Sequence, residues 1–233
     1  MCTVTFLPLS PPNFILTSNR DEQKIRETYP PKKYVENGVK MYFPKDKVAG
    51  GTWIGTSSKN RLVCVLNGAF TKHHRKESYS KSRGLIAKEL LQEEKIELYI
   101  RNLKLEGIEP FTMVIIEWNM HQLNLSELVW DENQKHFNKL KNEPRIWSSS
   151  TLYTNEMKMT RKGWFKNWIA ENEFTSEKIL AFHHSEIGDK EQSILMKRTY
   201  VETVSITSIK KENNTIEILY EDVVHGKRTT LII

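Results

Sequence analysis

Apolar positions along the chain recur with two periods, and the change from one to the other predicts a mixed fold. Short β-rich apolar runs bounded by turn-forming residues indicate strands. In four other segments the apolar residues recur at helical spacing. The predicted strands are residues 3–7, 13–17, 50–55, 60–66, 111–118, 122–130, 201–209, 215–220 and 228–232, and the predicted helices are residues 82–91, 94–103, 156–171 and 176–184. Runs of strands separated by paired helices are typical of the α+β class.

The first two strands are predicted to form a hairpin. Residues 8–12 between them are rich in proline and can donate few backbone hydrogen bonds, which favours a turn. If the turn is centred near Ser10, Ser18 lies opposite Cys2. Residues 27–47, by contrast, contain prolines and show no sustained period, so they are predicted to form a surface loop.

Length and composition favour one compact unit. The chain has 233 residues, 38% of them hydrophobic, and no linker divides it, so we expect a single domain over residues 1–233. No apolar run reaches the ~18 residues of a membrane helix, and residues 2–7 are too short for a secretory leader, so we expect a cytoplasmic protein. The two cysteines do not suggest a disulfide framework, and Cys64 is predicted to be a buried hydrophobic residue.

Charge is distributed unevenly. Residues 1–90 contain 16 Lys and Arg against 7 Asp and Glu, whereas residues 91–233 contain 19 against 22. A positive field of this kind favours a small anionic or acyl ligand, such as a carboxylate, a phosphate or an acyl conjugate. The lysines are scattered and no nucleic-acid motif is present, so we do not expect a nucleic-acid partner.

Cys2 is the candidate nucleophile. The initiator Met is normally removed when the second residue is small, so the mature chain would begin with a cysteine carrying both an α-amine and a thiol. The amine titrates at about 7.7–8.0 and the thiol at about 8.5, so the amine can take the thiol proton near neutral pH. No separate histidine base is then needed. The alternative is that Cys2 is an ordinary residue at the start of an edge strand.

Other candidates lie at the ends of predicted strands. The Arg20 guanidinium favours a thiolate and can hold a substrate carboxylate or carbonyl, while the Asp21 carboxylate can orient the α-ammonium group. Asn67 ends a strand beside Gly68 and can aim its carboxamide at an oxyanion, with an ordinary turn asparagine as the alternative.

The histidine pairs do not predict a metal site. Residues 73–74 lie in a polar stretch and residues 183–184 end a predicted helix, with no carboxylate or cysteine at ligand spacing. We predict that both pairs are solvated, and we expect neither a metal nor another cofactor. Four aromatic residues are predicted to pack helices on the sheet: Trp147, Trp164, Phe165 and Trp168.

Several motifs together resemble a known family. They are Cys2, Asn19-Arg20-Asp21-Glu22, Gly50-Gly51-Thr52-Trp53-Ile54-Gly55, Leu66-Asn67 and Ser82-Arg83-Gly84-Leu85, with later blocks at residues 146–153 and 203–207. This set resembles the NRDE family, whose eukaryotic members are the Transport and Golgi organisation 2 homologues. The family is similar to N-terminal nucleophile (Ntn) hydrolases of the penicillin V acylase and bile salt hydrolase type.

The resemblance implies an αββα sandwich and amide hydrolysis by Cys2, with Asp21 and Asn67 in catalytic roles. It also implies that Arg20, Asn19 and Trp53 bind substrate.

Two positions depart from the acylase pattern. Ser18 stands where the acylases have arginine. The position of a late asparagine is taken either by the Ser148-Ser149-Ser150 run or by Asn155.

Two functions therefore compete. In the first, the protein is an Ntn amidohydrolase that cleaves a linear amide of a small, anionic substrate through a Cys2 acyl-enzyme. In the second, it is a non-catalytic binding or trafficking protein that uses the same cleft for haem, acyl-CoA or a similar anionic amphiphile.

Overall fold

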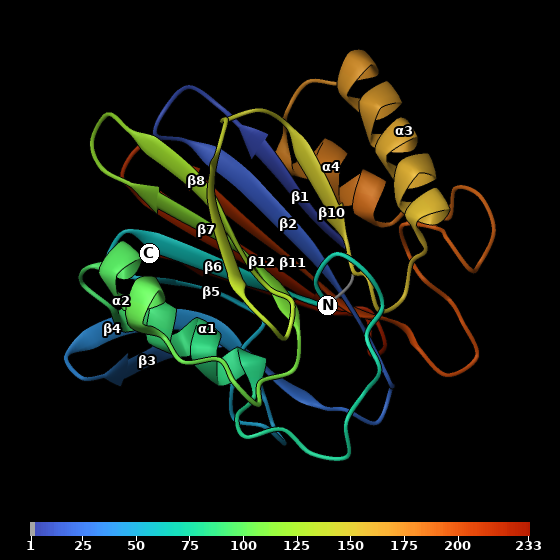
Figure 1. Ribbon diagram of the computed structural model, residues 1–233. Helices are drawn as coiled ribbons and strands as arrows, with labels where there is room; N and C mark the ends of the chain where they lie inside the picture. Colours follow the sequence, from blue (N-terminus) through green and yellow to red (C-terminus); the bar gives the residue numbers. More distant parts are fainter. Residues whose placement is uncertain (1–2) are drawn as a thin grey trace.

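Two antiparallel sheets packed face to face form the centre of the computed structural model, which describes residues 3–233. A pair of helices covers the outer surface of each sheet (Figure 1). The predicted α+β, αββα architecture is thereby confirmed. None of the helices in residues 3–233 is long and apolar enough to cross a membrane.

The first sheet has six strands in the order β10-β1-β2-β11-β12-β13. Its central strands join the two ends of the sequence, because β2 pairs with β1 on one side and with β11 on the other. The strands are β1 (Thr3–Pro8), β2 (Phe14–Glu22), β10 (Arg145–Ser148), β11 (Glu202–Glu212), β12 (Thr215–Asp222) and β13 (Lys227–Ile232).

The second sheet has seven strands in the order β3-β4-β5-β6-β7-β8-β9, which is also their order along the chain. Each strand therefore pairs with its neighbour in sequence, and the long connection between β6 and β7 contains helices α1 and α2. The strands are β3 (Thr28–Glu36), β4 (Val39–Asp46), β5 (Ile54–Ser57), β6 (Arg61–Asn67), β7 (Phe111–Trp118), β8 (Leu123–Trp130) and β9 (Lys135–Leu140).

Alternation of side chains along the strands divides the core into layers. On β6, Leu62, Cys64 and Leu66 pack between the sheets, while Val63 and Val65 pack under the outer helices. Cys64 is fully buried, as predicted, and burial raises the pKa of its thiol to about 12. Its thiol is therefore protonated and inert at neutral pH.

The helices begin where the sequence supplies a cap. Ser82 accepts a hydrogen bond from the Gly84 amide at 3.2 Å and starts α1 (Arg83–Gln92), and Thr154 and Thr175 cap α3 (Asn155–Glu171) and α4 (Ser176–His183) in the same way. Helices α1 and α2 (Ile96–Asn102) cover the seven-stranded sheet, and α3 and α4 cover the six-stranded sheet.

Three sequence predictions about strands were wrong or incomplete. Residues 27–47 form the hairpin β3–β4 instead of a loop, and the prolines fit because Pro30 and Pro31 lie at a bulge between Tyr29 and Lys32 of an edge strand. Strands β9 and β10 were not predicted because both are short and largely polar.

The register of the first hairpin also differs from the prediction. Thr3 pairs with Asn19 and Val4 with Ser18, so Ser18 lies opposite Val4. The turn is closed by hydrogen bonds from the Leu9 amide to the Asn13 carbonyl and from the Asn13 amide to the Ser10 carbonyl. The turn is thus centred on residue 11, one residue later than predicted.

Candidate active site

The candidate site is built around the start of β1. Thr3 is fully buried and lies between Asn19 of β2 and Ser148 of β10. The predicted nucleophile, Cys2, lies outside the described residues. The geometry that follows concerns the side chains around Thr3, to which Cys2 is covalently attached.

Strand β2 sends neighbouring motif residues to opposite faces of its sheet. The Asn19 carboxamide is buried towards α4, where it donates to the carbonyls of His183 (3.1 Å) and Ile194 (2.9 Å). Its oxygen lies 2.6 Å from Nδ1 of His183. Asn19 is thus fully engaged with the chain itself and joins β2 to the helical layer.

His183 is a correction to the prediction that both histidines of its pair are solvated. It is fully buried, and Thr5 Oγ1 lies 2.7 Å from its Nε2. Burial, with the nearby Arg161 charge, lowers the pKa of His183 to about 3, so the ring is neutral. Its partners then assign the proton to Nδ1, because the Asn19 oxygen can only accept. His184 is exposed, but its Nε2 lies 2.5 Å from Oε2 of Glu221.

Asp21 is held on the same side of β2. Thr203 Oγ1 donates to its carboxylate at 2.6 Å, and the Tyr153 hydroxyl donates at 3.4 Å. The carboxylate is almost completely buried. The Arg161 guanidinium stacks on the ring of the same tyrosine, 4.0 Å from its centroid. Tyr153 and Thr203 both lie in the later blocks that the sequence resemblance included, so the signal for them was present.

Arg161 is a residue that the sequence did not suggest. It is fully buried on α3, and its Nη1 donates to the carbonyls of Gln192 and Ser193 at 2.6 Å each. Nε donates to Ser148 Oγ at 2.9 Å, and Nη2 donates to Thr3 Oγ1. No carboxylate of residues 3–233 forms an ion pair with Arg161, so a buried positive charge stands directly beside Thr3.

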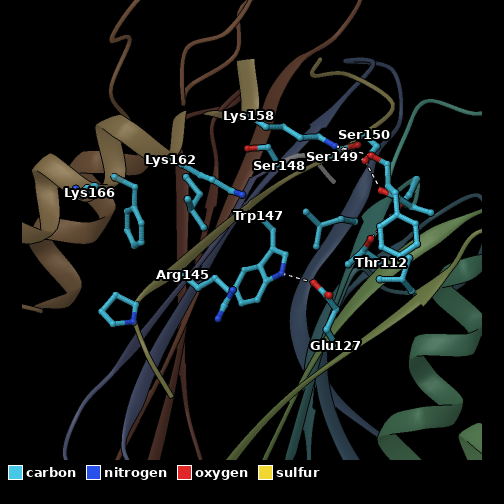
Figure 2. Close-up of a pocket in the computed structure, with 18 of the residues that line it drawn as sticks. Thr112, Glu127, Arg145, Trp147, Ser148, Ser149, Ser150, Lys158, Lys162 and Lys166 are labelled. Carbon is cyan, nitrogen blue, oxygen red and sulfur yellow. Dashed lines mark hydrogen bonds between the residues drawn. The ribbon is translucent and has the colours of Figure 1, made fainter. Parts of the chain in front are cut away.

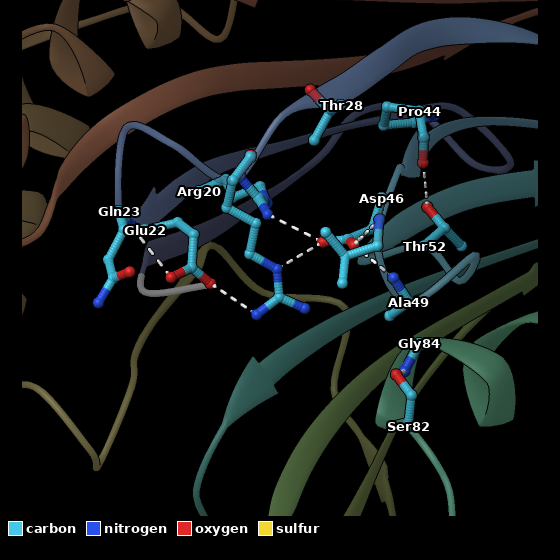
Figure 3. A network of polar contacts seen from close by, with 12 residues as sticks. Arg20, Glu22, Gln23, Thr28, Pro44, Asp46, Ala49, Thr52, Ser82 and Gly84 are labelled. Atoms are coloured by element: carbon cyan, nitrogen blue, oxygen red, sulfur yellow. Dashed lines mark hydrogen bonds and ion pairs between the residues drawn. The ribbon is translucent and has the colours of Figure 1, made fainter.

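Arg20 points to the opposite face and is braced by acids (Figure 3). Its Nη2 donates to Asp46 Oδ2 at 3.1 Å, and Arg26 Nε donates to the same oxygen at 2.8 Å. Arg26 also pairs with Glu22 at 3.3 Å. The Arg20 guanidinium lies 4.7 Å from the centroid of the Trp53 ring. This motif arginine is therefore neutralised within the protein.

Burial and neighbouring charges shift the pKa values of both Arg20 and Asp46. Burial lowers the pKa of Arg20, while Glu22 and Asp46 oppose the change. Burial alone would raise the pKa of Asp46, but hydrogen bonding from the Ala49 amide and the charges of Arg26 and Arg20 hold it below its usual range.

Asn67 ends β6 on the facing sheet and lines a small cavity of about 90 Å³ together with Arg20 and Trp53. Its carboxamide makes no hydrogen bond with any side chain or carbonyl of residues 3–233, so its NH₂ is available to a ligand. Gly68 follows with φ +83°, a turn that glycine adopts without strain. Three of the predicted site residues therefore meet at one cavity.

Of the two candidates for the late polar position, the serine run is at the site. Ser149 Oγ donates to the Asn67 carbonyl at 2.7 Å, and Ser150 Oγ donates to the Ala69 carbonyl. Lys158 Nζ donates to Ser150 Oγ at 2.6 Å and to the Phe70 carbonyl at 3.3 Å. Asn155 is the exposed first residue of α3 and lines neither this region nor the small cavity.

A second, larger cavity of about 610 Å³ opens on the other side of the β6 end, between α3, β10 and the β7–β8 pair (Figure 2). Leu66 and Gly68 from β6 and its turn line it, as do Ser148, Ser149 and Ser150. Trp147, predicted to be a packing residue, lies in its wall and donates to Glu127 at 2.7 Å. Phe165 belongs to one apolar cluster with Leu7 and Ile15 of the six-stranded sheet, and Trp164 and Trp168 pack against this cluster, as predicted.

Metal ligands are not gathered at either cavity, and residues 3–233 contain no group of three His, Cys, Asp or Glu side chains arranged for a metal ion. His73 is half-buried and 3.4 Å from Glu109, instead of solvated as predicted, while His74 is exposed.

Comparison with protein-family models identifies the family of this chain. The model described as Transport and Golgi organisation 2 matches residues 1–233. The chain belongs to the Transport and Golgi organisation 2 family. The predicted family relationship is thereby confirmed. A search of curated protein sequences gave no match.

Solved structures share the fold of this Transport and Golgi organisation 2 family member. One is the Caenorhabditis elegans N-acylethanolamine-hydrolyzing acid amidase ortholog, with TM-score 0.64 and 10% identity over 100% of both chains. Penicillin V acylase from Agrobacterium tumefaciens has TM-score 0.57 and 8% identity over 99% of this chain and 86% of that one. A variant of conjugated bile acid hydrolase from Clostridium perfringens has TM-score 0.55 and 10% identity, over 99% and 92%. At these identities the likeness establishes an Ntn-hydrolase fold.

Proposed function

We propose that this protein is an N-terminal-cysteine amidohydrolase that cleaves a linear amide of a small anionic substrate. The observation that carries the proposal is the convergence of four elements on the start of β1. Asp21 from β2, Arg161 from α3 and the Ser148–Ser149 segment at the end of β10 all lie around Thr3 or its strand partners. Asn67 from β6 joins them through its bond from Ser149.

In the proposed reaction, the Cys2 α-amine takes the thiol proton and the thiolate attacks the amide carbon. A carbon–sulfur bond forms while the carbonyl electron pair moves onto oxygen, where the Asn67 NH₂ stabilises it. The ammonium then gives its proton to the leaving nitrogen as the carbon–nitrogen bond breaks. Water attacks the resulting thioester, with the same amine as base, and releases the acid and the free thiol.

The surrounding residues have supporting roles in this proposal. Asp21 orients the α-ammonium group from its place between Thr203 and Tyr153. The unpaired charge of Arg161 favours thiolate over thiol, because an opposite charge stabilises the ionised form. Asn19 and Arg20, both taken up by protein partners, hold β2 in place. Trp53 forms the cavity wall beside Arg20.

The structural neighbours add support of a general kind. They are named as an acid amidase, an acylase and a hydrolase, and they have the same fold as this chain. Because fold alone does not fix activity, the proposal depends on the chemistry of Cys2.

The decisive experiment measures the intact mass of the protein before and after brief iodoacetamide treatment at neutral pH. We expect loss of Met1 and rapid alkylation of Cys2. Cys64 provides an internal control, because it is buried and its thiol pKa is raised to about 12, so it should remain unmodified. A retained Met1, or a Cys2 no more reactive than free cysteine, would remove the amine-as-base mechanism.

The matched variants are Cys2→Ala and Cys2→Ser. Both keep a small second residue, so the α-amine should still be exposed. In a screen of N-acyl amides, Cys2→Ala should lose all turnover and Cys2→Ser should retain a trace. Normal turnover by Cys2→Ala would disprove the proposed nucleophile.

The large cavity favours a second candidate function, the binding or transport of an anionic amphiphile without cleavage. Its walls combine apolar residues with Arg145, Lys158, Lys162 and Lys166. In this case haem or an acyl thioester should bind equally well to wild type and Cys2→Ala, followed for haem by its Soret band. Binding without turnover of any amide would favour this candidate.

A further inference from the structure

Three cations in the wall of the large cavity have no carboxylate partner within residues 3–233. Arg145, Lys162 and Lys166 line the cavity and make neither an ion pair nor a side-chain hydrogen bond there. The Nε atom of Arg145 is buried and unbonded. Figure 2 shows Lys162 extending from α3 towards Trp147, beside which the Arg145 guanidinium lies, 5.9 Å from the indole centroid.

The other charged groups of the wall are already engaged. Glu127 accepts the Trp147 indole hydrogen bond at 2.7 Å. Lys158 is bound to Ser150 and to the Phe70 carbonyl, and its burial, with the nearby Lys162 charge, lowers its pKa. The three remaining cations therefore face a cavity in which no free carboxylate of the described chain balances them.

Much of the remaining wall is apolar, although Thr112 and the Ser148-Ser149-Ser150 run also line it. The apolar side chains include Leu66, Val129, Ile146, Phe165 and Ile169. Lys162 and Lys166 are separated by one helical turn, so their Cβ atoms lie about 5–6 Å apart on one face of α3. Such an arrangement matches a ligand with an apolar body and an anionic end that spans more than one cation.

We propose that the ligand of this cavity is an acyl compound with an apolar chain and at least two negative charges, carboxylate or phosphate. A single negative charge would balance only one of the three cations, whereas two or more charges would occupy Arg145, Lys162 and Lys166 together. This inference rests on the proposed function only in assuming that the ligand contains a scissile amide. Binding of the ligand does not require that the amide be cleaved.

The test compares three amides that share one acyl chain. N-octanoylglutamate carries two negative charges, N-octanoylglycine carries one and N-octanoylethanolamine carries none. Equilibrium dialysis against Cys2→Ala protein at low salt measures their binding without cleavage. We expect the dianion to bind about tenfold more tightly than the neutral amide, since each partly exposed ion pair adds roughly a two- to fivefold gain.

The variant that tests the cations is Lys162→Gln combined with Lys166→Gln. It should reduce the affinity for N-octanoylglutamate to that for N-octanoylglycine and leave N-octanoylethanolamine binding unchanged. Lys33→Gln with Lys104→Gln is the matched control, because both lysines are exposed, lie outside the cavity and change the net charge equally. Equal affinity for the three amides, or equal loss in the control, would overturn the inference.

Octyl phosphate distinguishes the two anion chemistries. If it binds more tightly than N-octanoylglutamate, phosphate is the preferred group, and the reverse result indicates a dicarboxylate. Release of octanoate by wild-type protein is measured separately. Tight, lysine-dependent binding without release of octanoate would contradict the proposed hydrolase and support the proposed ligand class. Release of octanoate without any preference for charged amides would support the hydrolase and contradict the ligand class.

Discussion

The small cavity around Arg20 and the large cavity beside α3 both have walls rich in positive charge, but they differ in how that charge is balanced. Arg20 and Arg26 share Asp46 at 3.1 and 2.8 Å, and Arg26 also reaches Glu22. Arg145, Lys162 and Lys166 have no such partners within residues 3–233. Arg20, a motif residue, thus links the two sheets through Asp46. The cations that are available to a ligand lie outside the motifs.

Substitution of Asp46, beside the small cavity, should cause the largest loss of unfolding free energy. Asp46→Ala would leave Arg20 buried without its counter-charge, and removal of one partner of a buried pair costs about 3–5 kcal/mol. Urea unfolding at pH 7 measures the loss. Octanoylglutamate binding at the large cavity should not change when measured on the folded fraction.

Glu212→Gln is the control for Asp46→Ala, because Glu212 pairs with Lys210 at an exposed position. Its loss should be less than about 1 kcal/mol. A loss of that size for Asp46→Ala as well would show that the Arg20 network does not stabilise the fold.

Protonation of His183 at low pH should cause an intermediate loss of unfolding free energy. Its folded pKa of about 3 lies below the ordinary value of 6.5, so the unfolded chain binds the proton more readily. The stabilisation from the neutral ring is present above pH 6.5 and is lost as the pH falls towards 3. Between pH 6.5 and pH 4.5, wild type should lose about 2–3 kcal/mol of unfolding free energy beyond the loss in His183→Gln.

The exposed His121 is the control for this pH dependence, because its side chain makes no ion pair or hydrogen bond within residues 3–233. His121→Gln should follow the wild-type profile of unfolding free energy from pH 6.5 to pH 4.5. If His183→Gln also follows the wild-type profile, the Thr5–His183–Asn19 network does not keep the ring neutral.

The smallest effect concerns Arg161, which is buried like Arg20 but unpaired like the cations of the large cavity. Loss of its charge in Arg161→Met should raise the Cys2 thiol pKa and slow alkylation at pH 7 about tenfold, equivalent to roughly one pKa unit. Arg161→Lys keeps the charge and should retain most of the reactivity even where both variants lower stability. The rate of iodoacetamide reaction against pH distinguishes the two.

Identical pH profiles for wild type, Arg161→Met and Arg161→Lys would mean that Arg161 has only a structural role. The two cavities would then differ only in whether the cations in their walls form ion pairs.

The sequence predicted most of the framework because the signals were local. The helix that starts after Ser82 and the strand that ends at Asn67 both depend on residues near them in sequence. The β3 strand escaped prediction because its prolines are tolerated only at the bulge of an edge strand, which is a property of the sheet.

The site was predictable only in part for a similar reason. Arg20, Trp53 and Asn67 belong to motifs and do meet at one cavity. The partners of Arg161 and His183 include Thr3 and Thr5, at separations of 158 and 178 residues. Nothing local to either residue distinguishes a buried, bonded side chain from a solvated one.

The position of β1 has a consequence for when the site can come into existence. Strand β1 pairs early with β2 in the first hairpin, but its other neighbour, β10, lies more than 130 residues further along the chain, and β11, on the far side of β2, follows later still. Contacts between such distant segments form slowly because a long loop must close first. During synthesis, the surroundings of the proposed nucleophile would therefore be completed only after the segments that carry Ser148, Arg161 and Thr203 have been made.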